Sequence, residues 1–191
     1  MIRPSLANLL AKKPQLLVIG AHSGLSARLG ERAGFDAIWA SGFEISASHG
    51  VPDANILDMS EQLAAASHIN EAVSIPVIAD CDNGYGNAIN AAVTARKFAR
   101  AGIAAICIED NDFPKRCSFY SDARRRLVSA KEHALKVAAC KHSTHGELFV
   151  IARTEALIAG LGLDCAMERL EAYAEAGADA VLIHSKQKTP A

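Results

Sequence analysis

Short apolar runs recur along the chain, and turn-forming or charged residues bound each of them. Runs of this length between turn residues are typical of strands that are buried on both faces. We predict strands at residues 16–21, 36–40, 75–80, 104–109, 148–153 and 179–184. The intervening stretches predict helices at residues 24–33, 59–71, 87–101, 129–141 and 164–176.

Three helical stretches end in Ala-Gly, at Gly34, Gly102 and Gly177, and a short apolar run follows each of them. Glycine is favoured just past a helix because it adopts a positive φ without a Cβ clash. A repeated helix–glycine–strand unit is typical of βα repeats around a parallel sheet. The pattern therefore predicts an α/β fold.

Residues that can contribute chemistry follow every predicted strand: His22, Trp39, Ser41, Asp80, Asp82, Glu109, Arg153 and His184. In a (β/α)8 barrel the active site is built at the carboxyl ends of all the strands. A doubly wound sheet binds its ligand only where the strand order reverses. Because all six strands contribute, we favour a single (β/α)8 TIM-type barrel domain over residues 1–191.

Asp80 and Asp82 stand at the end of the third apolar run, ahead of Gly84 and Gly86. Residues i and i+2 of a strand point to the same side, so two such carboxylates would face one spot and repel unless a cation lies between them. Hard oxygen ligands of this kind suit Mg²⁺, with Mn²⁺ as an alternative. A solvated loop with acids at its tip is the other interpretation of this segment taken alone.

The composition narrows the function classes. The chain has 191 residues and a net charge of −1, without a basic stripe or an apolar run as long as a membrane span, which argues against nucleic-acid and membrane partners. The amino terminus lacks a signal-peptide pattern. Five cysteines without a C-x-x-C pair indicate neither a zinc site nor a disulfide framework. We expect a reduced, cytoplasmic protein.

The chain is short for the predicted fold. A complete barrel has eight βα units over roughly 250 residues, whereas this sequence supplies about six units in 191 residues. An open arc of six strands would leave two unpaired apolar edges. The chain is therefore either a fragment or truncated product that lacks the last units, or a natural six-stranded α/β protein.

Several stretches resemble the phosphoenolpyruvate mutase/isocitrate lyase superfamily in order and spacing: residues 39–48, 51–55, 78–87, 108–110, 113–115, 151–156 and 184–186. The final His-Ser-Lys favours the phosphoenolpyruvate mutase/phosphonopyruvate hydrolase branch over the carbon–carbon lyases. The resemblance implies a Mg²⁺-dependent enzyme that acts on the phosphorus–carbon bond of phosphonopyruvate. It also implies a homo-oligomer for the full-length protein.

The resemblance implies roles for the acids and for the oxo-acid pocket. Asp80 would bind Mg²⁺ directly, and Asp53, Asp82 and Glu109 would hold the water ligands of the ion. The backbone at Ser41 and Gly42 would bind the substrate carboxylate, with Trp39 as a wall.

The resemblance also implies roles at the phosphoryl end. Arg153 and His184 would face the phosphoryl group. A mobile lid over residues 110–127 would bring Lys115, Cys117 and Ser118 to the substrate.

The predicted lid departs from the mutase pattern Glu-Asp-Lys-x-x-Pro-Lys-x-Asn-Ser. Asn111 replaces the first lysine, and Cys117 replaces the asparagine that lies beside the phosphoryl group. The hydrolase has a threonine there, whereas the lyases have a catalytic cysteine within Lys-x-Cys-Gly-His. Residues 51–55 and 184–190 look more like the hydrolase, which we favour slightly.

Two further functions stay open at this point. One is a carbon–carbon lyase or decarboxylase of a 2-oxo acid or isocitrate-like substrate, with Cys117 as the acid. The other is an inactive truncated paralogue. Asp110 supports Glu109 or is an ordinary loop acid, and we expect His133 at the surface.

Overall fold

The computed structural model describes residues 5–118 and 125–187. Six parallel strands form one sheet in sequence order: β1 (Val18–Ala21), β2 (Ala37–Ala40), β3 (Val77–Asp80), β4 (Ala105–Glu109), β5 (Phe149–Thr154) and β6 (Ala180–Ile183). The helices are α1 (Leu6–Lys12), α2 (Gly24–Arg32), α3 (Gly42–Ser48), α4 (Met59–Ala72), α5 (Ala88–Arg100), α6 (Ala130–Ser143) and α7 (Gly162–Glu175).

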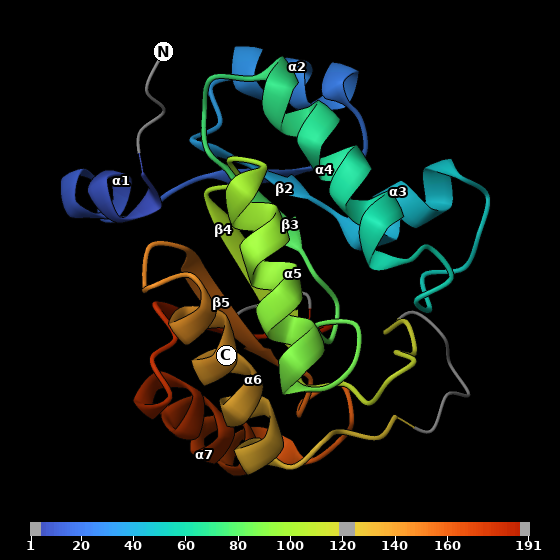
Figure 1. The fold of residues 1–191 in the computed structure, drawn as a ribbon, viewed down its shortest axis with the longest axis vertical. Helices are drawn as coiled ribbons and strands as arrows, with labels where there is room; N and C mark the ends of the chain where they lie inside the picture. Colours follow the sequence, from blue (N-terminus) through green and yellow to red (C-terminus); the bar gives the residue numbers. More distant parts are fainter. Residues whose placement is uncertain (1–4, 119–124, 188–191) are drawn as a thin grey trace.

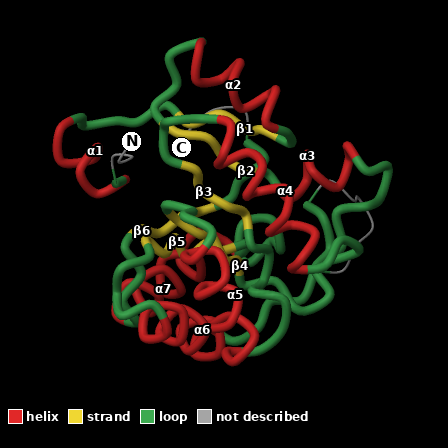
Figure 2. The backbone as a smooth tube through the Cα atoms, turned by 45° about the horizontal axis from the view of Figure 1, so that its top comes forward, coloured by secondary structure: helices red, strands yellow, loops and turns green. Residues whose placement is uncertain are grey.

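The sheet is an open arc with helices along its outer side (Figures 1 and 2). Helix α2 packs against α4 at one end of the molecule, and α5, α6 and α7 pack side by side at the other. Within the described residues β1 and β6 are the edge strands of the sheet. Parallel strands in sequence order, with the helices between them packed on one side, are the architecture of a (β/α)8 barrel. The predicted α/β fold with six barrel strands is confirmed.

The strands alternate between an outer and an inner face, because successive side chains of a strand point to opposite sides. Ile38, Val77, Ile106 and Val150 face the helices and form the main core. Ala37, Ile78, Cys107 and Ile151 face inward and form a smaller cluster with Leu6 of α1. The inner face is the one that a closed barrel would fill with side chains.

Each predicted strand lies within one or two residues of an observed one, and the five predicted helices are present. Helices α1 and α3 were not predicted. Each has only seven residues and starts at a serine N-cap, Ser5 or Ser41. A helix of two turns is too short to show a clear period of apolar residues, so the serine N-caps were the only signal for these two helices in the sequence.

The prediction that His133 lies at the surface is wrong. Its side chain is completely buried, as are Lys136 and Cys140 on the same face of α6. Positions i, i+3, i+4 and i+7 of a helix share one face, and here that face includes polar residues. The Lys136 ammonium donates to the carbonyl oxygen of Asn83, 3.0 Å away, which compensates its burial.

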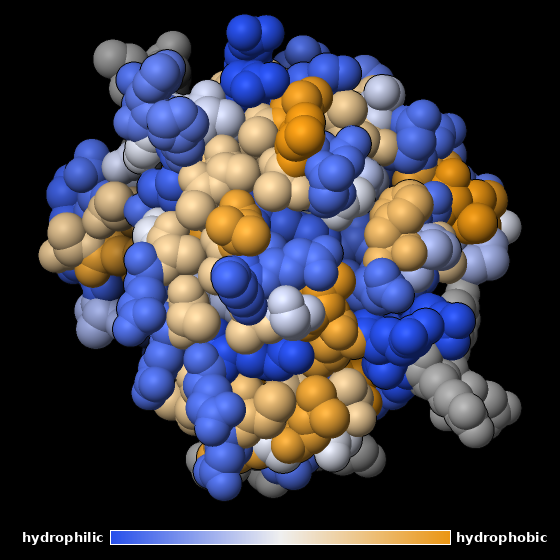
Figure 3. All heavy atoms as spheres, turned by 60° about the horizontal axis from the view of Figure 1, so that its bottom comes forward, coloured by the Kyte–Doolittle hydropathy of each residue, from blue (hydrophilic) through white to orange (hydrophobic). Residues whose placement is uncertain are grey.

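The surface drawn in Figure 3 mixes blue hydrophilic residues with tan and orange hydrophobic ones. Among the described helices, none has both the length and the apolar character needed to span a membrane.

Candidate active site

The inner-face positions at the carboxyl ends of the strands carry the predicted site residues. Trp39, Asp80, Glu109 and Arg153 follow the same alternation as the inward-facing apolar residues before them. Glu109 of β4 is the register partner of Arg153 of β5, and Arg153 Nη2 lies 3.2 Å from Glu109 Oε2. The barrel register therefore brings acids and cations from different strands to one place.

A cavity of about 220 Å³ opens at this place. Ten predicted residues line it: Trp39, Ser41, Asp53, Asp80, Glu109, Lys115, Cys117, Ser118, Arg153 and His184. Four residues without a predicted role line it too: Phe43, Asn111, Arg116 and Glu155. The position of Glu155, two residues past Arg153 at the end of a predicted strand, was the signal that could have identified it.

Lys115 enters the acid cluster from the loop after β4. Its ammonium lies 2.7 Å from Asp53 Oδ1 and also pairs with Asp82 Oδ1. Lys115 and Asp82 are both buried, with 5% and 2% of their side chains exposed. A charge buried this deeply needs a partner of opposite sign, so the lysine and the acids stabilise one another.

Burial and mutual repulsion perturb the acids. Burial raises the pKa of Asp82 to about 7, against the opposing effect of Lys115. It raises the pKa of Asp53 as well. Burial also disfavours the charged form of Glu109, but the Arg153 and Lys115 cations outweigh it and lower the pKa of that carboxyl. The cluster thus holds more negative charge than its surroundings easily stabilise, which favours binding of a further cation.

The extended-strand argument does not apply to Asp82, because β3 ends at Asp80 and Asp82 has a φ of 49°. A turn brings the acids together instead, with the Asp82 N–H donating to Asp80 Oδ1 at 3.1 Å. A Cβ atom on Gly42 would lie 3.3 Å from Asp82 Oδ1 and 3.5 Å from Asp80 Oδ2. The lack of a side chain at Gly42 therefore leaves both carboxylates room.

The donor set fits a magnesium ion. Asp53, Asp80, Asp82 and Glu109 offer only oxygen atoms, which Mg²⁺ prefers, and the ion usually keeps several waters while one or two carboxylates bind it directly. Within the described part of the chain, no three His, Cys, Asp or Glu side chains are grouped closely enough to hold an ion on their own. Oxygen donors of this kind suit an ion that retains water ligands.

Asn55 connects three segments around the acid cluster. Its Nδ2 donates to Asp82 Oδ2 at 2.8 Å. Its Oδ1 accepts from the Lys115 N–H at 2.6 Å and from Asn83 Nδ2 at 3.4 Å. Asn55 has a φ of 55°, a conformation that asparagine tolerates better than most residues. It anchors the backbone of the loop that carries Lys115.

Arg153, Glu155 and His184 form a second charged group in the lining of the cavity. Glu155 Oε1 accepts from Arg153 Nε at 2.5 Å and lies 2.8 Å from His184 Nδ1. Arg153 Nη2 lies 2.7 Å from the same ring nitrogen. Burial opposes the charge of Arg153, but Glu109 and Glu155 raise its pKa above the ordinary value. The guanidinium is therefore permanently charged.

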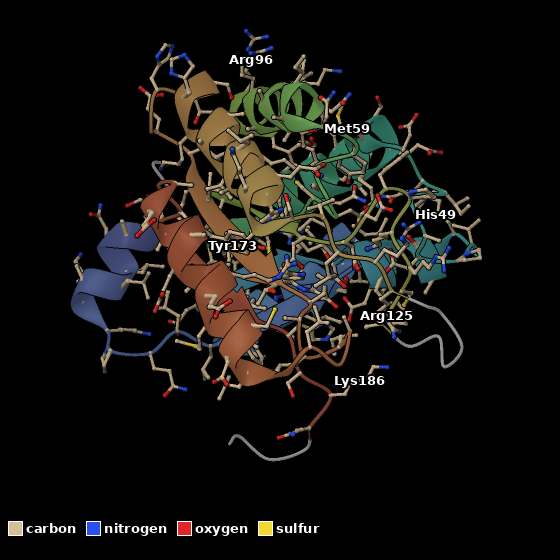
Figure 4. All side chains as sticks on the ribbon, turned by 90° about the horizontal axis from the view of Figure 1, so that it is seen from below. His49, Met59, Arg96, Arg125, Tyr173 and Lys186 are labelled. Carbon is tan, nitrogen blue, oxygen red and sulfur yellow. The ribbon has the colours of Figure 1, made fainter. Side chains whose placement is uncertain are left out.

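Asp110 lies behind the cavity and is completely buried. Its carboxylate accepts from Thr154 Oγ1 at 2.8 Å, the Glu155 N–H at 2.8 Å, Arg169 Nη1 at 3.0 Å and the Tyr173 hydroxyl at 2.7 Å. Tyr173 extends from α7 toward the interior (Figure 4). Asp110 is thus no ordinary loop acid, because it ties the end of β5 to α7.

The predicted lid is described only in part, because residues 119–124 lie outside the described residues. In the described part Lys115, Cys117 and Ser118 line the cavity. Arg125 Nη2 donates to the carbonyl oxygens of Cys117 at 3.0 Å and Ser118 at 2.7 Å. Arg125 is labelled in Figure 4. The mobility of residues 110–127 stays a prediction.

Parallel strands with an acid cluster and a cationic group at their carboxyl ends define a (β/α)-barrel protein with an active-site-like cavity. Residues 6–191 match the model of the phosphoenolpyruvate phosphomutase family. The chain belongs to this family, within the phosphoenolpyruvate mutase/isocitrate lyase superfamily, as its motifs had indicated.

Individual relatives agree with this assignment. The chain is 53% identical to a phosphonopyruvate hydrolase from Variovorax sp. (strain Pal2), over 90% of this chain and 60% of the relative. It superposes on the crystal structure of a phosphoenolpyruvate phosphomutase from Streptomyces platensis subsp. rosaceus with a TM-score of 0.90 and 52% identity, over 96% of this chain and 65% of that one.

A third relative carries a metal ion. The structure of a phosphonopyruvate hydrolase in complex with oxalate and Mg²⁺ has a TM-score of 0.83 and 49% identity, over 92% of this chain and 60% of that one. The chain spans about 60% of the length of the first curated relative it matches.

Proposed function

We propose that this chain forms the catalytic part of a Mg²⁺-dependent enzyme that cleaves the phosphorus–carbon bond of phosphonopyruvate, with water as the phosphoryl acceptor. One observation carries the proposal: a single cavity is lined by the acids Asp80 and Glu109 together with Arg153 and His184. This arrangement suits a substrate with an oxo-acid end and a phosphoryl end. The 53% identity to a phosphonopyruvate hydrolase supports the choice of water.

The oxo-acid end would lie against Trp39, Ser41 and Gly42. The first N–H groups of a helix have no intrahelical partners, so the start of α3 offers donors to the substrate carboxylate. Bond cleavage leaves the enolate of pyruvate, and a Mg²⁺ ion held by the acid cluster, with Asp80 as its direct ligand, would supply Lewis-acid stabilisation of that charge. Asp53, Asp82 and Glu109 would orient the water ligands.

The phosphoryl end would face Arg153 and His184. A departing phosphoryl group resembles metaphosphate, so positioned cations do most of the catalytic work. Arg153 Nη1, which no contact among the described residues engages, would donate to a phosphoryl oxygen, while Nε and Nη2 stay bound to Glu155 and Glu109. Lys115, held between Asp53 and Asp82, would keep the lid closed over the substrate. Ser118 would line the same end.

Cys117 supports a second candidate function. Its side chain lines the cavity and is only 5% exposed. If this thiol delivers a proton to a carbanion, the enzyme is a carbon–carbon lyase or decarboxylase of a 2-oxo acid or isocitrate-like substrate. If the thiol only lines the cavity, the lid lacks the amide with which the asparagine of the mutases would hold the phosphoryl group. A water molecule can then occupy the position of that amide.

The test is ³¹P NMR of phosphonopyruvate mixed with the protein and Mg²⁺, beside a chelated control. Inorganic phosphate that forms only with Mg²⁺ supports the hydrolase, whereas a phosphoenolpyruvate signal supports a mutase. An unchanged phosphonate signal from folded protein refutes both phosphonate activities. It leaves the lyase, in which Cys117→Ser abolishes pyruvate release, or an inactive paralogue, which releases none from any substrate.

Two broader proposals accompany this function. Among the described residues the five cysteines form no disulfide, which suits the reducing cytoplasm. A homo-oligomer is the expected state of a full-length protein, and light scattering coupled to size exclusion measures it.

A further inference from the structure

We propose that Glu155 is a positioning residue of the active site, which sets the proton of His184 on Nδ1 and orients Arg153, so that the guanidinium and the imidazole ring both face the phosphoryl end of the substrate. The proposal rests on the proposed function for the identity of the substrate, but its geometry is independent of any ligand.

The Glu155 carboxylate is placed to do this. It is buried, with 1% of its side chain exposed, and its own N–H is held by Asp110 Oδ1 at 2.8 Å. Its Oε1 bonds to Arg153 Nε, and both of its oxygens lie near His184 Nδ1, at 2.8 and 3.1 Å. One rigid carboxylate therefore contacts both side chains that the proposed reaction places at the phosphoryl group.

The contacts around His184 Nδ1 cannot all be satisfied at once. A carboxylate only accepts hydrogen bonds and a guanidinium only donates them. If Nδ1 carries a proton, it donates to Glu155 and opposes the Arg153 Nη2 donor, 2.7 Å away. If Nδ1 is bare, it accepts from Arg153 and opposes the carboxylate. The protonation site of His184 is therefore a choice between Glu155 and Arg153.

We expect Nδ1 to carry the proton and to donate to Glu155, because Arg153 has another acceptor for its Nη2 donor. Arg153 Nη2 has a second acceptor in Glu109 Oε2, 3.2 Å away. Glu155 Oε1 keeps the Arg153 Nε donor, but among the described residues Glu155 Oε2 has only His184 Nδ1, 3.1 Å away, and would be buried without a donor if that nitrogen were bare. The proton therefore resides on Nδ1, and the hydrogen bond there orients the ring.

The arrangement leaves specific atoms for the substrate. Among the described residues no hydrogen bond engages Arg153 Nη1 or His184 Nε2, and both residues line the cavity. A phosphoryl group that arrives there meets the Arg153 Nη1 donor, from β5, and the imidazole ring of His184, directly after β6, both held by Glu155. With the proton on Nδ1, the neutral ring presents Nε2 as an acceptor. The Arg153 donor, fixed in advance, stabilises developing charge without reorganisation.

The experiment is ¹⁵N NMR of the histidine rings in the substrate-free protein, at a pH where imidazole is neutral. The ¹⁵N shifts distinguish the Nδ1–H from the Nε2–H form, and the signal that is absent from His184→Asn assigns the residue. We expect Nδ1–H for His184 in the wild type. In Glu155→Ala, Arg153 Nη2 is the remaining partner, so the ring switches to Nε2–H.

Two variants make the test sharper. Glu155→Gln keeps a carbonyl oxygen for Nδ1 and is expected to retain the Nδ1–H form. The matched control Asp179→Asn removes a carboxylate at the opposite end of β6, where it pairs with Lys141, and is expected to leave His184 unchanged. Nε2–H in the wild type, or Nδ1–H in folded Glu155→Ala, overturns the proposal. If Glu155→Ala does not fold, the wild-type spectrum alone still shows whether His184 carries its proton on Nδ1.

Turnover provides a second measurement. Misplacement of groups that act on the transition state costs about 10²-fold, so we expect kcat of Glu155→Ala on phosphonopyruvate to fall about 10²-fold, with a much smaller change in KM. A change confined to KM contradicts the positioning role. If the wild type does not turn over phosphonopyruvate, the proposed function fails, while the NMR result still stands for Glu155.

Discussion

Replacing Asp110 by asparagine tests whether this buried acid stabilises the protein by linking the end of β5 to α7. The substitution preserves shape but removes the charge and turns one acceptor oxygen into a donor amide. Asp110 Oδ2 alone accepts from Thr154 Oγ1, Arg169 Nη1 and the Tyr173 hydroxyl. An amide nitrogen at that position would face three donors.

The expected cost follows from the burial of the pair. Asp110 is completely buried and Arg169 is 13% exposed, so the variant leaves a largely buried arginine without its anion. Removal of one partner of a buried ion pair costs about 3–5 kcal/mol. For a chain of this size each kcal/mol lowers the midpoint of thermal unfolding by roughly 2–4 °C, which gives a decrease of about 10 °C.

The assay is urea and thermal unfolding followed by circular dichroism, with Tyr173→Phe as the matched control. That variant removes one donor to Asp110 and is expected to cost about 1 kcal/mol. The double variant should be less unstable than the sum of the two, because both changes affect one network. An Asp110→Asn protein within about 1 kcal/mol of the wild type would refute this account of the network.

Three other outcomes are expected. Mg²⁺ at about 100 times its Kd should stabilise the protein by about 2.7 kcal/mol, which is measured as a higher Tm. Asp80→Asn should remove this increase in Tm. An increase that persists in the variant contradicts the assignment of Asp80 as a ligand. Asn55→Gly, which tolerates the positive φ, removes the anchor of Lys115 and should cost about 1–3 kcal/mol in urea unfolding, whereas unchanged stability would show that the anchor is dispensable. Burial lowers the pKa of His133 from 6.5 to about 4, so the stability it contributes is present above about pH 6.5 and is lost as the pH falls through about 4, by about 3 kcal/mol in total. His133→Leu should therefore show a flatter pH dependence of the urea midpoint, and parallel curves for the two proteins would exclude this cause.

The strands were predictable because each is a short apolar run with a glycine or a charged residue at its boundary. Gly102, which precedes β4, is one example. The site residues on strand ends were predictable for a related reason. A residue such as Arg153 continues the inner-face alternation of its strand, so its direction follows from a period of two.

Other features depend on partners that no local pattern reveals. The prediction for His133 failed because the polar residues around it on α6 look like a solvated face, while the neighbouring Tyr173 ring, 4.6 Å away, comes from α7. Glu155 and Asp110 have their roles only because β4, β5, β6 and α7 meet behind the cavity. Asn55 could not be recognised as an anchor before the fold placed Lys115 beside it.

Some of the site residues lie on strands of the sheet, and others lie on the loop after β4. Trp39, Asp80 and Arg153 stand on strands whose other face is buried in the main core, so their positions are tied to the integrity of the whole domain. Lys115 and Cys117 stand on a loop that the barrel register does not constrain. Exchanging the loop sequence is therefore a tractable route to new chemistry in the laboratory. A library confined to residues 116–118 would vary side chains that line the cavity while Lys115 and the acids that it pairs with stay in place.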